Sequence, residues 1–263
     1  MSQNILEIKD LSKFFGGLAA VSDCSLKIKK GSITGIIGPN GSGKTTLFNL
    51  IAGNLKSSKG KVLFNDEDIT NVPSYELFSK GILRTFQIAH EFSNLTVLEN
   101  LMMVPGNQSG ENLMTALLKP KLVEKEEEKI KKKAFEVIEF LNLKHLSNEL
   151  AGNLSGGQKK LLELGRTMMV DAKLVLLDEV GAGVNRTLLK DLGTAILRLN
   201  REKGYTFCMI EHDMDFISRM CNPVIVMSDG SVLFEGSSEE VKKNERVIES
   251  YLGRTTKIDK EIS

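Results

Sequence analysis

Residues 38–46 read GPNGSGKTT, and this stretch decides how the rest of the chain is interpreted. It fits the pattern G-x-x-x-x-G-K-[ST], in which a glycine loop joins a strand to a helix. A short apolar run at residues 33–37 precedes the loop, and apolar residues recur at helical spacing over residues 47–51. A strand, loop and helix in this order point backbone N–H groups and a positive helix end at one spot. The sequence therefore predicts a polyphosphate site.

Each part of the loop has a predicted role at the polyphosphate. Lys44 can reach the β- and γ-oxygens, and the Thr45 hydroxyl can ligate Mg²⁺. The alternative is a glycine-rich turn that matches by chance, but the flanking strand and helix weigh against it. The predicted phosphate-binding residues are Gly38, Pro39, Asn40, Gly41, Ser42, Gly43, Lys44, Thr45 and Thr46.

The composition is that of an ordinary globular protein and gives no sign of a nucleic-acid or membrane-spanning class. The 263 residues suffice for one large domain or two small ones. A net charge of +1 provides no field that attracts nucleic acid, so no such partner is expected. No apolar stretch approaches the ~20 residues of a membrane span. The first ten residues alternate polar and apolar instead of forming a signal-peptide core, so we expect a cytoplasmic protein.

The three cysteines carry little functional signal. Cys24, Cys208 and Cys221 are odd in number and show neither C-x-x-C spacing nor a nearby histidine cluster. Buried, reduced thiols are therefore expected instead of a metal site or a disulfide framework.

Alternating residues on both sides of an aromatic pair indicate antiparallel strands ahead of the loop. Residues 5–7 and 25–29 alternate in strand fashion, and Phe15 lies between them before two glycines. Such an aromatic residue either packs as a satellite of the core or, in a nucleotide-binding protein, stacks on an adenine. The residues alone leave both interpretations open.

The segment after the first helix ends in a polar amide. Residues 61–64 are typical of a strand, residues 75–80 of a short helix, and residues 82–87 of another strand ending at Gln87. Gln87 is either a solvated strand end or a sensor near Mg²⁺ that detects the γ-phosphate through a water molecule.

From about residue 91 to 165 the pattern is helical. Residues 96–99 fit a capping box, and an amphipathic helix with i,i+4 charge pairs is predicted over residues 121–141. Its charges are interpreted as a solvated face, not as a nucleic-acid patch. The structure of residues 104–120 is not predicted.

Residues 154–158 read LSGGQ and open another predicted helix over residues 159–169. Ser155 as N-cap and Gln158 as its reciprocal partner form a capping box, which explains these two residues structurally. Capping does not explain Gly156 and Gly157, because each glycine costs roughly 1 kcal/mol in a helix. Bare N–H groups beside a serine hydroxyl at a helix N-terminus indicate a second anion site.

Two apolar runs are followed by side chains that can bind metal or phosphate or transfer a proton. The run at residues 174–177 is followed by Asp178 and Glu179, as expected where a buried parallel strand meets a ligand. Asp178 is predicted to hold Mg²⁺ through water and Glu179 to act as general base, although a solvated acidic turn is the alternative. The run at residues 207–210 precedes His212, which is a structural residue or a γ-phosphate contact.

The remaining pattern completes an α/β chain. Residues 188–199 predict a crossover helix, and residues 224–227 and 231–235 predict a hairpin around the turn at residues 228–230. A C-terminal helix and a polar tail follow.

The ordered set GPNGSGKTT, Gln87, LSGGQ, LLDE and His212 resembles the ATP-binding subunit of ABC transporters over nearly the whole chain. The resemblance implies an α/β fold, with a RecA-like P-loop ATPase core, an antiparallel β subdomain and an inserted α-helical subdomain. The implied boundaries within a single 1–263 domain are 1–90 and 166–236 for the core and β subdomain, 91–165 for the helical subdomain, and 237–263 for the C-terminal helix and tail.

The resemblance also implies a head-to-tail dimer, homomeric or heteromeric, that holds each ATP between the loop of one subunit and LSGGQ of the other. Phe15 becomes the adenine-stacking aromatic residue, and Ser155, Gly156, Gly157 and Gln158 become nucleotide contacts. The implied catalytic residues are Glu179, His212 and Gln87, and the implied metal-site residues are Thr45, Gln87 and Asp178.

Finer motifs resemble the ATPases of branched-chain amino acid importers and their urea and amide relatives. These motifs are RTFQ at 84–87, TVLENL at 96–101, IEHDM at 210–214 and SYLG at 250–253. They imply membrane permeases as partners, a solute-binding protein as an indirect one, and a peripheral location on the inner face of the membrane. The alternatives are the ATPase of lipopolysaccharide export, a soluble ABC-type assembly ATPase and a P-loop kinase.

Two positions depart from the family pattern. Val180 stands where proline usually follows the catalytic glutamate, and Asn185 stands where the D-loop most often has aspartate. The departures concern how the D-loop couples the two ATP sites, and neither removes a phosphate or metal ligand.

Overall fold

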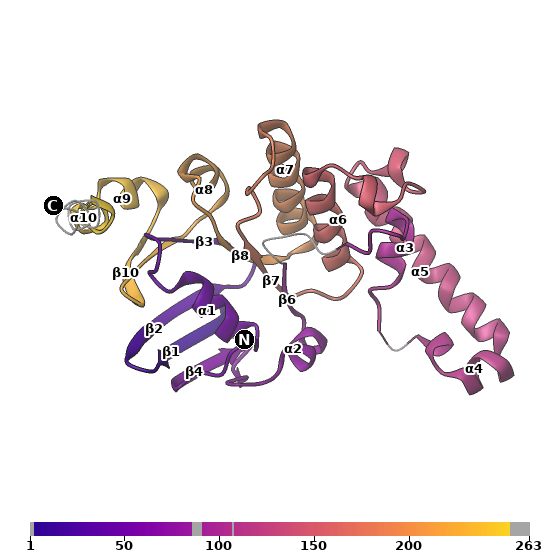
Figure 1. Ribbon diagram of the computed structural model, residues 1–263, viewed down its shortest axis with the longest axis horizontal. Helices are drawn as coiled ribbons and strands as arrows, with labels where there is room; N and C mark the ends of the chain where they lie inside the picture. Colours follow the sequence, from indigo (N-terminus) through magenta and orange to yellow (C-terminus); the bar gives the residue numbers. More distant parts are fainter. Residues whose placement is uncertain (1–2, 86–90, 107, 253–263) are drawn as a thin grey trace. The chain divides into compact units, whose positions relative to one another are not determined.

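The computed structural model describes residues 3–85, 91–106 and 108–252 (Figure 1). The chain divides into two compact units. The first unit consists of Met1–Arg84, Lys173–Gly181 and Leu197–Ser263, and the second of Thr85–Ala172 and Ala182–Ile196.

A four-stranded antiparallel sheet forms one layer of the first unit, in the order β2-β1-β4-β5. Its strands are β1 (Asn4–Phe15), β2 (Leu18–Lys29), β4 (Lys59–Phe64) and β5 (Glu67–Asp68). The alternation in the sequence predicted β1, β2 and β4 but made both β1 and β2 too short, and β5 was not predicted. Because β1 and β2 pair as far as Phe15 and Leu18, the aromatic residues belong to the strand end and only two glycines make the turn.

A six-stranded sheet forms the second layer of this unit, in the order β10-β9-β3-β8-β7-β6. Its strands are β3 (Ile33–Ile37), β6 (Ile82–Arg84), β7 (Leu174–Asp178), β8 (Thr206–Ile210), β9 (Val224–Ser228) and β10 (Ser231–Gly236). Neighbouring strands from β9 to β6 are parallel, and β10 closes the predicted hairpin with β9. The strand predicted over residues 82–87 ends at Arg84, where its pairing with β7 ends.

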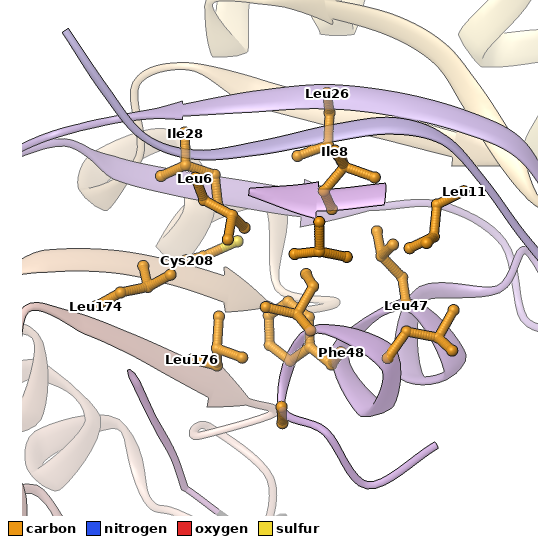
Figure 2. Close-up of a cluster of buried hydrophobic side chains, with 14 of the residues drawn as sticks. Leu6, Ile8, Leu11, Leu26, Ile28, Leu47, Phe48, Leu174, Leu176 and Cys208 are labelled. Carbon is orange, nitrogen blue, oxygen red and sulfur yellow. The ribbon is translucent and has the colours of Figure 1, made fainter. Parts of the chain in front are cut away.

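The core of the first unit lies between the antiparallel sheet, helix α1 (Lys44–Ile51) and the parallel strands (Figure 2). Leu47 and Phe48 of α1 are fully buried there. Figure 2 labels Leu6, Ile8, Leu11, Leu26 and Ile28 from the antiparallel strands, and Leu174, Leu176 and Cys208 from the parallel ones. All three cysteines are buried thiols, as predicted, and burial raises the pKa of Cys24 to about 12.

Four further helices lie wholly within the described part of the first unit. They are α2 (Ser74–Lys80), α8 (Met214–Met220), α9 (Ser238–Lys243) and α10 (Glu245–Leu252). The single C-terminal helix of the prediction is thus two helices. Asn244 has an extended backbone that ends α9, and its side-chain Oδ1 accepts from the Val247 N–H at 3.2 Å, which caps α10.

The second unit is helical, as predicted. It contains α3 (Val97–Met102), α4 (Leu113–Leu118), α5 (Pro120–Phe140), α6 (Gly156–Met168) and the start of α7 (Arg186–Lys203). Among the described residues of this unit, 3₁₀ turns lie between these helices at Ser109–Glu111, Lys144–Leu146 and Ala151–Asn153. The Thr96–Glu99 capping box is present at α3.

The second unit packs around Gly165 of α6. A Cβ atom at this position would meet Leu141, Val137 and Leu101, so the missing side chain lets α6 approach the α3 and α5 region closely. No helix in the described part of the chain is long and apolar enough to cross a membrane.

Candidate functional site

The glycine loop leaves the end of β3 and enters α1, as the sequence predicted. Gly38 has a φ of 152° and Gly43 a φ of 96°, which are conformations that side chains rarely adopt. A Cβ atom at Gly38 would collide with the Met227 carbonyl oxygen, and one at Gly43 with the Ala20 carbonyl oxygen. These two positions therefore require glycine for space as well as for backbone geometry.

Lys44 lies over the loop and is only 6% exposed. Its Nζ donates to the carbonyl oxygens of Gly38 at 2.8 Å and Pro39 at 3.1 Å, and to the Ser42 hydroxyl at 3.5 Å. The ammonium group is thus held at the loop by oxygen atoms, a role that phosphate oxygens can take over. Thr45, at the first turn of α1, is exposed and accessible to a ligand.

The ends of β7 and β8 bring Glu179 and His212 together. Glu179 follows β7 with a φ of 48°, and its N–H donates to the Ile210 carbonyl oxygen at 2.9 Å. Its Oε1 lies 3.1 Å from His212 Nε2, with side-chain exposures of 24% and 49%. The sequence predicted both residues at strand ends, but their contact depends on the parallel pairing of β7 and β8. A carboxylate oriented by an imidazole can position a water molecule.

Asp178 is held by a residue to which the sequence analysis gave no role. Arg84 Nη2 donates to Asp178 Oδ2 at 2.6 Å, and Arg84 Nη1 donates to Asn49 Oδ1 at 2.5 Å. Asn49 belongs to α1, so Arg84 links the acidic end of β7 to the helix that follows the glycine loop. The signal for Arg84 was its place in RTFQ, three positions before the predicted sensor Gln87.

Glu211 is a second residue that the sequence reasoning missed. It is 5% exposed, and its carboxylate accepts from the Gly181 N–H at 2.7 Å and from the His212 N–H at 3.3 Å. Burial raises the pKa of Glu211, while these backbone hydrogen bonds oppose the rise. Glu211 thereby anchors the backbone just after Glu179. A carboxylate directly after an apolar strand was the available signal.

Phe15 ends β1 and is 48% exposed. The Lys13 ammonium lies 5.1 Å from the centroid of its ring. Its exposure argues against the core alternative, and the strand that pairs with it, β2, touches the glycine loop where the Ala20 carbonyl oxygen faces Gly43.

In the second unit, LSGGQ forms the predicted capping box at the start of α6. Gln158 N–H donates to Ser155 Oγ at 3.4 Å, and Ser155 N–H donates to Gln158 Oε1 at 2.9 Å. Gly157 has a packing reason that the sequence did not reveal, because a Cβ atom there would overlap the Leu188 side chain. Gly156 is exposed, and its nearest outside atom, Gly183 O, would lie 3.8 Å from an added Cβ.

The two departures from the family pattern fit their surroundings. Asn185 Oδ1 accepts from the Leu188 N–H at 2.9 Å and so caps the start of α7. Val180 is buried, with 4% of its surface exposed.

Thr45 of α1 and Asp178 of β7 offer oxygen donors of the kind that Mg²⁺ prefers. Thr45 contributes a hydroxyl and Asp178 a carboxylate, and Gln87 lies outside the described residues. Within residues 3–85, 91–106 and 108–252, no group of three or more His, Cys, Asp or Glu side chains could hold a metal ion. Mg²⁺ commonly binds through one or two oxygen side chains together with waters and substrate phosphates, and the Thr45 hydroxyl and the Asp178 carboxylate are donors of this kind.

A parallel α/β sheet with a glycine loop, a buried lysine and acidic strand ends defines a nucleoside-triphosphate-binding protein. Residues 21–182 match the ABC transporter family, and residues 231–255 match the family of branched-chain amino acid ATP-binding cassette transporters. The chain belongs to the ABC transporter family and is its ATP-binding ATPase component.

Individual relatives agree with this assignment over nearly the full length. A probable branched-chain amino acid transport ATP-binding protein LivG from Archaeoglobus fulgidus is 45% identical, with 95% of each chain covered. The solved ADP conformation of an ABC transporter cassette has a TM-score of 0.81 at 40% identity, covering 96% of this chain and 100% of that one. A dimeric bacterial ABC transporter cassette has a TM-score of 0.72 at 25% identity, covering 89% and 98%.

Proposed function

We propose that the chain is the ATP-hydrolysing motor subunit of an importer for branched-chain amino acids or a related small polar solute. The observation that carries this proposal is the match of residues 231–255 to branched-chain amino acid cassette transporters. It lies outside the region common to ABC transporters and therefore bears on the subgroup. No observation favours lipopolysaccharide export, an assembly ATPase or a kinase.

The proposed chemistry assigns one task to each side chain of the candidate site. Lys44 binds the β- and γ-phosphates, while Thr45 would ligate Mg²⁺ and Asp178 would hold it through water. Glu179 takes a proton from the attacking water, and His212 orients that carboxylate and contacts the γ-phosphate. The 3.1 Å contact between Glu179 and His212 supports this pairing. Gln87 keeps its proposed role as sensor, and Phe15 its role at the adenine.

The proposed assembly is a head-to-tail dimer. The exposed backbone at Ser155 and Gly156 opens a helix of 13 residues, and its N–H groups suit a γ-phosphate presented by a second cassette. Gly157 and Gln158 keep that helix start in shape through packing and capping. ATP then bridges the subunits, and hydrolysis removes the bridging charge. A related cassette has been solved as a dimer, which supports the arrangement.

The proposed setting is the inner face of the cell membrane. The cassette, a single domain over residues 1–263 with a helical subdomain at 91–165, binds integral membrane permeases and acts indirectly with a solute-binding protein. We propose no nucleic-acid partner, because the net charge of +1 provides no attracting field.

Transport by the reconstituted complex tests the proposal. The chain is assembled with its candidate permeases in proteoliposomes, and uptake of radiolabelled leucine is compared with uptake of urea. ATP-dependent leucine uptake that is lost with Lys44→Ala is the expected result. ATP hydrolysis without uptake of either solute would contradict the assignment to this importer subgroup.

A further inference from the structure

Arg84 and Asp178 form a buried ion pair at the metal side of the proposed ATP site. The distance between Arg84 Nη2 and Asp178 Oδ2 is 2.6 Å, and the two side chains are only 12% and 6% exposed. Arg84 Nη1 is fixed by Asn49 Oδ1 of α1. The remaining donor, Arg84 Nε, is buried and has no hydrogen-bond partner among the described residues.

When no metal is bound, the positive charge of Arg84 neutralises the negative charge of Asp178. A carboxylate this deeply buried is strongly unfavourable without a counter-charge, and breaking such a pair leaves an uncompensated charge. Among the described residues, Arg84 is the hydrogen-bond donor to the Asp178 carboxylate. Asn49 accepts from the other terminal nitrogen, Nη1, and so fixes the guanidinium while Nη2 donates to Asp178.

We propose that Arg84 is a positioning residue that stands in for Mg²⁺ at Asp178 and competes with it electrostatically. This inference rests on the proposed role of Asp178 at the metal. In the metal-free protein Arg84 keeps the carboxylate fixed and neutralised. When Mg²⁺ arrives with the nucleotide, two cations share one carboxylate, and their mutual repulsion weakens the metal's hold. Arg84 therefore lowers the affinity of the site for Mg²⁺ and favours release of the metal.

Replacing Arg84 by methionine separates this role from simple packing. Arg84→Met removes the charge but keeps an unbranched side chain. The metal-free state then carries an unpaired buried carboxylate, which Mg²⁺ neutralises on binding. The ratio of ADP affinity with Mg²⁺ to ADP affinity in EDTA should therefore rise about tenfold over that of the wild type. The unfolding temperature of the variant should be lower than that of the wild type in EDTA, and Mg²⁺ with ADP should largely restore it.

Isothermal calorimetry with ADP, which cannot be hydrolysed, is the measurement. Arg84→Lys keeps the charge but cannot span both partners, so we expect a smaller rise in the same direction. This variant also serves if Arg84→Met fails to fold. Lys80→Met is the matched control, because it breaks an exposed 2.7 Å pair with Glu67 and should leave the ratio unchanged.

The outcomes separate the inference from the function on which it rests. If the ADP affinity of the wild type is the same with Mg²⁺ and in EDTA, the proposed metal site itself is wrong. A wild type that responds to Mg²⁺, with Arg84 variants whose ratio is unchanged or lower, would overturn the role of Arg84 alone. If the Arg84 variants lose the same thermal stability with Mg²⁺ as without it, Arg84 has only a structural role.

Discussion

At the residue scale, Phe14 and Phe15 are adjacent aromatic residues at the end of β1 and offer a matched test of adenine stacking. They are 40% and 48% exposed, and successive side chains of a strand point to opposite faces. Phe15→Ala should weaken ATP binding by roughly 1 to 3 kcal/mol, the scale of stacking a base on an aromatic side chain. Phe14→Ala should leave ATP affinity unchanged in calorimetry. The reverse pattern would transfer the stacking role to Phe14.

Glu211 gives the protein a predictable pH dependence. Burial raises the pKa of Glu211 in the folded state above the ordinary value of a glutamate, so folding favours its protonated form. The stability that this group contributes is present below the unfolded pKa and is lost as pH rises through the folded pKa. Glu211→Gln does not ionise. The free energy of unfolding of the wild type, minus that of Glu211→Gln, should therefore fall as pH rises from about 4.5.

Urea unfolding at a series of pH values measures that difference. The sign of the change of this difference with pH is the test. Glu211→Gln also loses the hydrogen bond to the His212 N–H, but we expect that loss to change the difference by the same amount at low and at high pH. A difference that grows with pH would mean that the two backbone N–H groups stabilise the ionised carboxylate more than burial penalises it.

At the scale of one element, the start of α6 contains two glycines with different reasons to be there. Gly156 has open space, so Gly156→Ala should stabilise the protein by up to about 1 kcal/mol through helix propensity. Gly157→Ala gains the same propensity but pushes a Cβ atom into Leu188, and should be less stable than Gly156→Ala. Thermal unfolding of the two variants checks the order. Equal stabilisation would show that Leu188 moves aside at little cost.

At the scale of the whole molecule, Glu179→Gln tests the dimer and the base together. Glutamine keeps the size of the side chain but lacks its basicity, so turnover should fall by on the order of 10² to 10⁴ while ATP still binds. ATP that cannot be hydrolysed should hold two cassettes together, whereas the wild type returns to monomers. Size-exclusion chromatography with light scattering, with and without ATP, measures both.

Two results of that experiment would count against the proposal in different ways. Near-normal turnover would remove Glu179 as the base. An inactive variant that stays monomeric in ATP would leave the base in place and argue against a homodimer, pointing to a different ATPase chain as partner.

The sequence by itself determined the elements and the local parts of the site. Periodicity predicted the strands around the loop and the long helix α5, because a local pattern of burial follows directly from the order of residues. The loop at residues 38–46 and the capping box at Ser155 were predictable for the same reason, since their hydrogen bonds join residues a few positions apart. Even the helix break at Asn244 is local, although the sequence analysis missed it.

Only the tertiary structure decided which distant residues meet. Arg84 and Asp178 are 94 positions apart in the sequence, and Glu179 and His212 are 33 apart, so no local pattern contains either contact. The parallel order β6-β7-β8 brings these strand ends to one edge of the sheet. Likewise, Leu188 makes Gly157 a packing requirement only after α7 has folded against α6. Sequence chemistry thus identified the reacting groups, and strand pairing decided which charges face one another.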